Sequence, residues 1–89
     1  MPRYFFDIYN GSGPVRDDEG RELPDSEVAR AEAVIGARSL VADEVMQGRL
    51  DLDGRIEVLD GERRPLFAIS FAEAVTPSDD DNAVPQLGT

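Results

Sequence analysis

One long segment without proline constrains the fold of this chain more than any other feature. Ser26 to Gln47 contains no proline and many good helix formers. Asp25 before it and Gly48 after it are residue types that begin and end helices. We therefore expect a single helix that starts at Asp25 or Ser26 and ends near Gly48. In a chain of 89 residues, such a helix needs a sheet on which to bury one face.

Two apolar surfaces run along this expected helix. At about 100° per residue, the broader arc contains Val28, Ala31, Val34, Ile35, Val41, Ala42, Val45 and Met46. A second strip, roughly opposite, contains Ala29, Ala33, Ala37 and Leu40. We predict that the broader arc faces the sheet, with Ile35 central in the core. Arg38 then projects into this arc, where its guanidinium snorkels to solvent or pairs with a carboxylate of the sheet.

The segments on both sides of the helix alternate between apolar and polar residues, as strands do. Arg3 to Tyr9, the turn Asn10 to Gly13 and a short returning strand around Pro14 to Asp17 predict a first hairpin. Arg55 to Leu59 and Pro65 to Phe71, joined by a turn, predict a second one. The fold class is therefore α+β in the order β-β-α-β-β, a four-stranded antiparallel sheet with one long helix on one face.

The domain organisation is simple. Residues 1–75 are expected to form a single α+β domain, in which Ala72 to Val75 adds a last turn of structure. Residues 76–89 form an acidic tail that contains proline and has the composition of a disordered segment.

The face of the sheet away from the helix is the candidate interaction surface. Strand alternation places eight residues under the helix, namely Phe6, Ile8, Val15, Ile56, Val58, Phe67, Ile69 and Phe71. On the other face it leaves an apolar set, which consists of Phe5, Tyr9, Leu59, Leu66 and Ala68. Several apolar residues converging on one face are typical of an interface. We expect a twofold homodimer through this face, with coverage by the tail or by another protein as alternatives.

Composition restricts the possible chemistry. The nineteen carboxylates outnumber the nine cations, all of which are arginine, so the net charge is −10. This charge disfavours nucleic acid and anionic lipid as partners, and it is compatible with either solubility or docking to a basic protein.

Without cysteine, histidine or lysine, the chain has no means of thiol, imidazole or Schiff-base chemistry. We predict no catalytic residue, no cofactor and no metal site. With neither a membrane span nor a signal peptide in the sequence, we expect a cytoplasmic protein.

Three short motifs were candidates for ligand sites. Asp51 to Gly54 resembles part of a calcium loop, but Arg49 then occupies the first ligand position. Asn10 to Gly13 is rich in glycine, yet it joins two strands and does not open a helix, so it lacks the dipole of a phosphate loop. The carboxylates from Asp17 to Glu22 offer a possible acid/base pair, with no nucleophile beside them. We interpret all three as turns.

Several segments together resemble a known family. They are the opening Met1 to Ile8, the turn Asp17 to Gly20, Leu23 to Asp25 before the helix, Arg55 to Val58, and Phe71-Ala72. The family consists of short bacterial proteins classed only as a domain of unknown function. The resemblance covers residues 1–75 and implies a single intracellular domain with no assigned activity. A weaker architectural resemblance, through Gly48, is to antitoxin domains that cap a basic toxin.

These observations favour a small, non-enzymatic protein-interaction module, expected to be homodimeric. The alternatives are an antitoxin-like inhibitor of a basic partner and a small enzyme that uses the carboxylates of Asp17 to Glu22.

Overall fold

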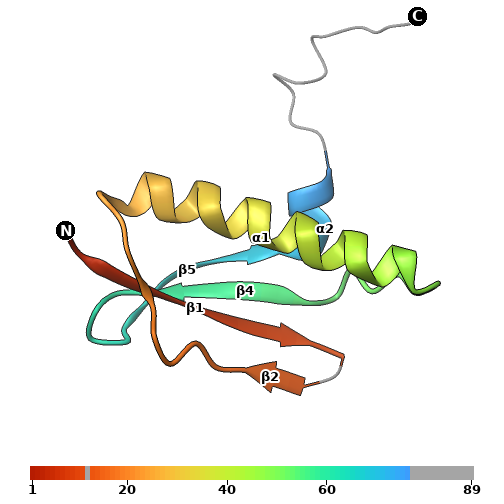
Figure 1. Cartoon of the computed structure of the whole chain (residues 1–89), viewed down its shortest axis with the longest axis horizontal. Helices are drawn as coiled ribbons and strands as arrows, with labels where there is room; N and C mark the ends of the chain where they lie inside the picture. The colour runs from red at the N-terminus through yellow and green to blue at the C-terminus, as the bar shows by residue number, and fades with distance from the viewer. Residues whose placement is uncertain (12, 77–89) are drawn as a thin grey trace, which may run out of the picture.

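The chain forms one antiparallel sheet with a long helix and a short helix on the same face (Figure 1). The structure is a computed structural model that describes residues 1–11 and 13–76. The predicted α+β class and the approximate β-β-α-β-β order are confirmed. The predicted disordered tail lies outside the described residues, apart from Thr76.

Within the described residues, five strands make up the sheet, one more than predicted. They are β1 (Arg3–Asn10), β2 (Gly13–Val15), β3 (Arg21–Glu22), β4 (Arg55–Leu59) and β5 (Pro65–Ser70). The order across the sheet is β2-β1-β4-β5, and β3 pairs with the start of β1. A strand of two residues is too short for alternation to reveal it, which explains why β3 was missed. The central pair, β1 and β4, aligns Phe6 with Val58 and Ile8 with Ile56.

Helix α1 (Ser26–Met46) begins and ends where the sequence predicts. The Asp25 carboxylate accepts a hydrogen bond from the Val28 amide at 2.9 Å and so satisfies one of the free amides of the first turn. Gly48 follows the last turn with φ +81°, a conformation in which glycine is favoured.

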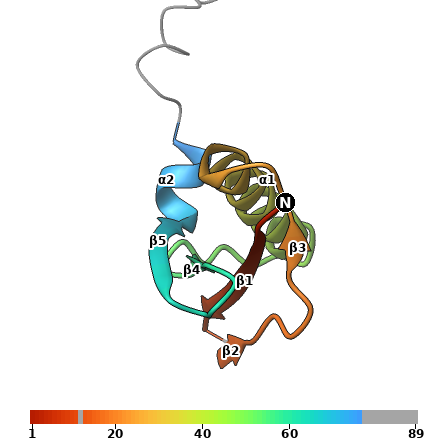
Figure 2. The ribbon, with the colours of Figure 1, turned by 90° about the vertical axis from the view of Figure 1, so that its left-hand side faces the viewer.

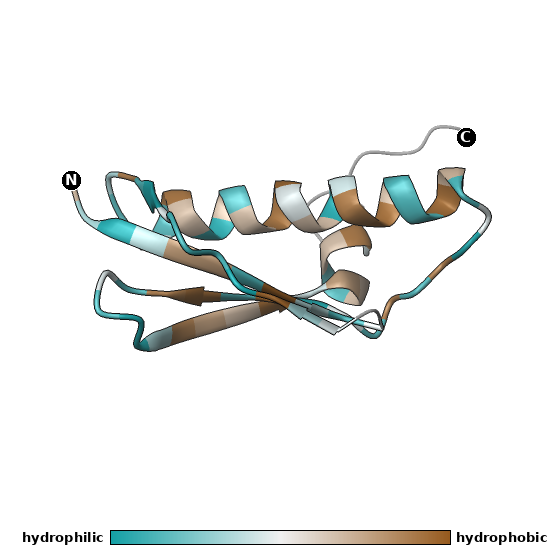
Figure 3. Cartoon of the chain, turned by 60° about the horizontal axis from the view of Figure 1, so that its bottom comes forward, coloured by the Kyte–Doolittle hydropathy of each residue, from teal (hydrophilic) through white to brown (hydrophobic). Residues whose placement is uncertain are grey.

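The rotation of α1 about its own axis differs from the prediction. The side chains that α1 buries are those of Ala29, Ala33, Ala37 and Val41, whereas Ile35 is 55% exposed and Val45 is 54% exposed. Hydrophobic bands recur along the whole of α1 (Figure 3), so hydropathy alone does not determine its buried face. The sheet already supplies bulky side chains such as Phe6, and small alanines let the helix approach them closely.

The short helix α2 (Phe71–Val75) follows directly after β5. Ser70 and Glu73 form a reciprocal capping box at its start, and Phe71 and Ala74 are buried. The sequence predicted that the strand continues to Phe71. In the structure Phe71 instead opens a helix. Arg38 of α1 donates from Nε to the Ala74 carbonyl at 2.6 Å, so its partner is α2 and not a carboxylate of the sheet.

The two helices cover the sheet unevenly. α1 packs on β4, β5 and α2, and α2 packs on β5. In both Figure 1 and Figure 2, β2 lies at the end of the sheet that is remote from the two helices. Val15 of β2, which was predicted to lie in the core, is consequently 54% exposed. The β1–β2 side of the sheet is therefore the less covered half of this face.

Candidate functional site

Arg63 crosses the face of the sheet that lies away from the helices. It projects from the β4–β5 turn, and its Nη2 atom lies 2.6 Å from Oδ2 of the buried Asp7 on β1. Its Nη1 atom donates to the Asp17 carbonyl at 3.0 Å, and its guanidinium carbon lies 4.8 Å from the centre of the Phe5 ring. The chain thus covers part of its own second sheet face with a charged side chain.

The five residues of the predicted interface do not form one exposed apolar patch. Leu59 is buried, with 6% of its surface exposed. Phe5 and Tyr9 are partly buried, each beneath an arginine, and Arg55 lies 4.4 Å from the centre of the Tyr9 ring. Leu66 and Ala68 are exposed on β5. Strand alternation gave no sign that arginines of the same chain would stack on the two aromatic rings.

Asp17 replaces a missing strand pairing at the edge of β1. β2 pairs with the end of β1 and β3 with its start, and between them the Phe6 amide donates to Asp17 Oδ2 at 3.0 Å. Asp17 Oδ1 accepts from the amides of Glu19 and Gly20 at 3.2 and 3.0 Å. This one carboxylate therefore fixes the loop 16–20 and satisfies the β1 edge.

The electrostatics of Asp17 do not suit a general acid. Partial burial raises the pKa of its carboxyl, but the hydrogen bonds from the Gly20, Phe6 and Glu19 amides and the charge of Arg21 outweigh that effect. The net pKa lies below the ordinary value of 3.8. A carboxylic acid that donates a proton near neutral pH needs the opposite shift.

An open groove of about 530 Å³ lies between α1 and the loop 16–21. We call it the α1 groove. Its floor consists of the sheet residues Phe6, Ile8 and Ile56. One wall is the flank of α1, at Ala33, Gly36, Ser39 and Leu40. The other is the loop with the start of β3, at Asp17, Gly20 and Arg21. Its volume falls within the range of ligand sites in proteins.

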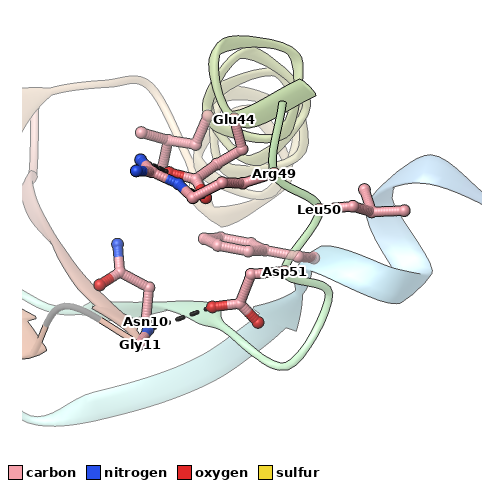
Figure 4. A pocket seen from close by; sticks show the side chains of 8 residues that line it. Asn10, Gly11, Glu44, Arg49, Leu50 and Asp51 are labelled. Carbon is pink, nitrogen blue, oxygen red and sulfur yellow. Dashed lines mark hydrogen bonds and ion pairs between the residues drawn. The ribbon is translucent and has the colours of Figure 1, made fainter. Parts of the chain in front are cut away.

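A second cavity of about 330 Å³ continues in the same direction toward the end of α1. Leu40 lines both cavities, and Asn10 follows Phe6 and Ile8 on the same face of β1. Figure 4 shows Arg49 and Glu44 together on one side of this cavity and Asp51 hydrogen-bonded to the Gly11 amide on the other. We call it the terminal pocket. The two cavities together follow the flank of α1 from Glu32 to Glu44.

Arg21 closes the other end of the α1 groove. Its guanidinium lies 4.9 Å from the centre of the Phe6 ring, and its Nη1 atom lies 2.6 Å from the Glu32 carboxylate on α1. The linings of the groove and the terminal pocket together contain three arginines and five carboxylates, a net charge of −2. The site is therefore an apolar trough with an acidic rim.

The turn Asp51 to Gly54 has a structural role. Asp51 accepts hydrogen bonds from the Gly11 and Asp53 amides. At Gly54 a β-carbon would lie 2.5 Å from the Phe71 ring and 2.7 Å from the Tyr9 carbonyl, so a side chain does not fit. Across residues 1–11 and 13–76, no three acidic side chains are grouped so that they could hold a metal ion.

Sequence reasoning did not identify the groove. Its lining comes from β1, β2, β4, the loop 16–21 and α1, and no motif connects them. One signal was present, namely Gly36 in the interior of a helix, where glycine is unfavourable.

Neither helix in the described part of the chain is both long and apolar enough to cross a bilayer.

The fold and the groove define a two-layer α+β domain with an apolar groove, acidic at its rim, beside its long helix. The chain belongs to the family described as a domain of unknown function (DUF6894), whose model matches residues 3–72. The family resemblance seen in the sequence is thereby confirmed. No curated protein and no solved structure matches the chain. The resemblance to antitoxin domains stays a prediction.

Proposed function

We propose that this domain is a protein-interaction module that holds an apolar and cationic part of a partner protein in the α1 groove. One observation carries the proposal: the β1–β2 side of the sheet leaves Ile8 and Leu40 only partly buried, beside a rim that is net negative. Covering this apolar surface stabilises a complex, and the acidic rim favours basic partners over acidic ones.

An enzyme based on carboxylates has less support. Of the carboxylates that line the two cavities, Asp17 is held by backbone amides, Glu32 by Arg21 and Glu44 by Arg49. Groups held in this way give a rim its charge but are poorly placed to exchange protons with a substrate. We therefore propose binding and not catalysis.

A homodimer through the second sheet face also has less support than a different partner. One of its five predicted residues, Leu59, is buried within the chain, and another, Phe5, lies beneath Arg63. The net charge of −10 repels a second copy and attracts a basic protein. An antitoxin-like inhibitor of a basic protein is one form that this proposal can take.

The test is site-specific photo-crosslinking in the cells that make the protein. A photoreactive amino acid replaces Ser39, which is exposed and lines the groove, or Val45, which is exposed on the side of α1 turned away from Gly36 and lines neither cavity. We expect one crosslinked protein from position 39 and none from position 45. If the crosslink from position 39 disappears when Gly36→Leu is added, the contact is assigned to the groove. Crosslinks absent from both positions, or equal at both, would contradict the proposal.

A further inference from the structure

We infer that the occupant of the α1 groove is an amphipathic helix with basic residues, which lies alongside α1 as a second helix on the sheet. The inference rests on the proposed function and specifies the chemistry of the partner.

The sheet leaves a strip beside α1 on which one face of this helix can lie. Four strands spaced by about 4.8 Å span roughly 15–20 Å, whereas a helix with its side chains is about 10–12 Å wide. α1 and α2 pack toward β4 and β5. The strip that remains beside α1, over Phe6 and Ile8, is therefore roughly 5–8 Å wide, which suits the apolar face of a helix whose other face stays in solvent.

The length of the strip fits a helix of ordinary size. The α1 residues that line the two cavities run from Glu32 to Glu44, and at 1.5 Å per residue this is about 18 Å, or about three helical turns. A partner helix of about 12 to 15 residues would cover it. Such a helix contacts a groove through apolar residues at positions i, i+3, i+4 and i+7.

An extended strand is a poorer occupant, because the adjacent edge of β1 has no pairing position left. β3 pairs at Arg3 and Tyr4, the Asp17 carboxylate holds the Phe6 amide, and β2 pairs from Ile8 to Asn10. A peptide in the groove therefore gains no strand pairing with β1. A helix satisfies its own backbone internally and needs only its side chains to bind.

The charges of the lining select a basic helix. Arg21 and Arg49 are already paired with Glu32 and Glu44 of α1. Asp17, Glu19 and Asp51 also line the cavities, and the described residues provide none of the three with an ion-pair partner. Lysines or arginines that flank the apolar face of a partner helix would complement these carboxylates.

Gly36 marks the point where the partner comes closest to α1. A β-carbon here would lie 3.5 Å from Ile56 Cδ1, which is an ordinary contact, so the fold itself does not require glycine. Glycine nevertheless weakens the interior of a helix relative to alanine. Its effect in this structure is to leave space in the wall of the groove.

The probe for this inference is a library of 15-residue peptides displayed on phage, selected against the full chain. We expect enriched peptides to combine a helical apolar repeat with lysine or arginine and to lack internal proline. Their affinity should fall at least tenfold for Gly36→Leu, which fills the groove. It should stay within twofold for Ala42→Leu, the same side chain added at an exposed position of α1 outside both linings.

Three outcomes would overturn the inference. They are enrichment of acidic or proline-containing peptides, equal binding by Gly36→Leu, and no enrichment at all. If a crosslink from position 39 were still obtained in cells, the interaction module would stand and only its helical, basic ligand would be rejected. If neither experiment gave a signal, both proposals would fail.

Discussion

Arg63 is a single residue that links three separate parts of the chain. It adopts φ +64°, a left-handed conformation that costs a residue other than glycine about 1 kcal/mol. The bonds of its guanidinium to Asp7 and to the Asp17 carbonyl offset this cost. Strand alternation places Asp7 on the face of the sheet away from the helix, so the sequence gives no sign that Asp7 is buried or that Arg63 reaches it.

Arg63→Ala should destabilise the domain by about 3 kcal/mol, because it leaves the carboxylate of Asp7 buried without its cation. The matched control is the neighbouring Arg64→Ala. The Arg64 side chain is exposed and pairs at the surface with Asp60 and Glu62, so its loss should change stability by less than about 0.5 kcal/mol. Urea unfolding measures both effects. Equal costs would contradict the role assigned to Arg63.

Asp17→Asn should reduce the dependence of stability on acid pH. Folding lowers the pKa of Asp17, so its carboxylate stabilises the fold above the ordinary pKa of 3.8. This stabilisation is lost as the pH falls through the lower pKa of the folded state. At about pH 7 the variant should be less stable by about 1–2 kcal/mol, because the Phe6 amide loses its acceptor.

Toward about pH 2 the unfolding free energies of wild type and Asp17→Asn should converge. Asp60, whose pKa is lowered mainly by the hydrogen bond from the Arg64 amide, remains in both proteins and keeps part of the acid dependence. A gap that stays constant from pH 7 to pH 2 would show that the charge of Asp17 has no part in stability.

At the scale of elements, the boundaries of α1 were predictable and its rotation was not. Asp25 and Gly48 set the ends through local chemistry that the sequence contains in full. The buried face depends on which side chains the sheet offers, and a sheet that already provides tyrosine and phenylalanine leaves space mainly for small residues, three alanines and Val41. That information lies in strands far from the helix in sequence.

Ile35→Ala and Ala37→Leu test the rotation of α1. Ile35 is more than half exposed, so its truncation should cost less than about 1 kcal/mol. Ala37 is fully buried, and a leucine there should overpack the core and cost about 1–3 kcal/mol or more. Thermal unfolding followed by circular dichroism measures both. A larger loss for Ile35→Ala would restore the rotation predicted from hydropathy.

Gly36→Ala should raise the unfolding free energy by about 0.5–1 kcal/mol, since alanine is the better helix former and its β-carbon fits beside Ile56. Gly54→Ala should do the opposite and destabilise the domain strongly, because its β-carbon meets the Phe71 ring. Chemical denaturation distinguishes the two. A destabilised Gly36→Ala would mean that the glycine serves packing and not the groove.

For the whole molecule, the layers were predictable from the order of the elements, whereas the site was not. A groove arises from the mismatch between the width of the sheet and the width of the helices, and that mismatch depends on where α1 comes to rest. The predicted interface failed to form one exposed patch for a related reason. Arg55 and Arg63 reach its aromatic rings only once β4 and β5 have paired with β1.

Light scattering at micromolar concentration tests the oligomeric state. We expect the mass of a monomer, unchanged by Leu66→Glu, because Leu66 and Ala68 alone make a small exposed patch on β5. A mass of twice the monomer that is halved by Leu66→Glu would instead restore the homodimer through the second sheet face.

The pairing of β1 with β4 also has a consequence for the way the protein is synthesised. The two central strands lie about fifty residues apart in sequence, and Phe5 pairs with Leu59, for example. Neither strand can bury its apolar side chains in a core until the other is present. The first hairpin and α1 therefore leave the ribosome before any surface exists on which they can be buried. Folding must wait until β4 and β5 emerge, since long-range pairing cannot begin earlier. Until then, the aromatic residues of β1 are open to chaperones.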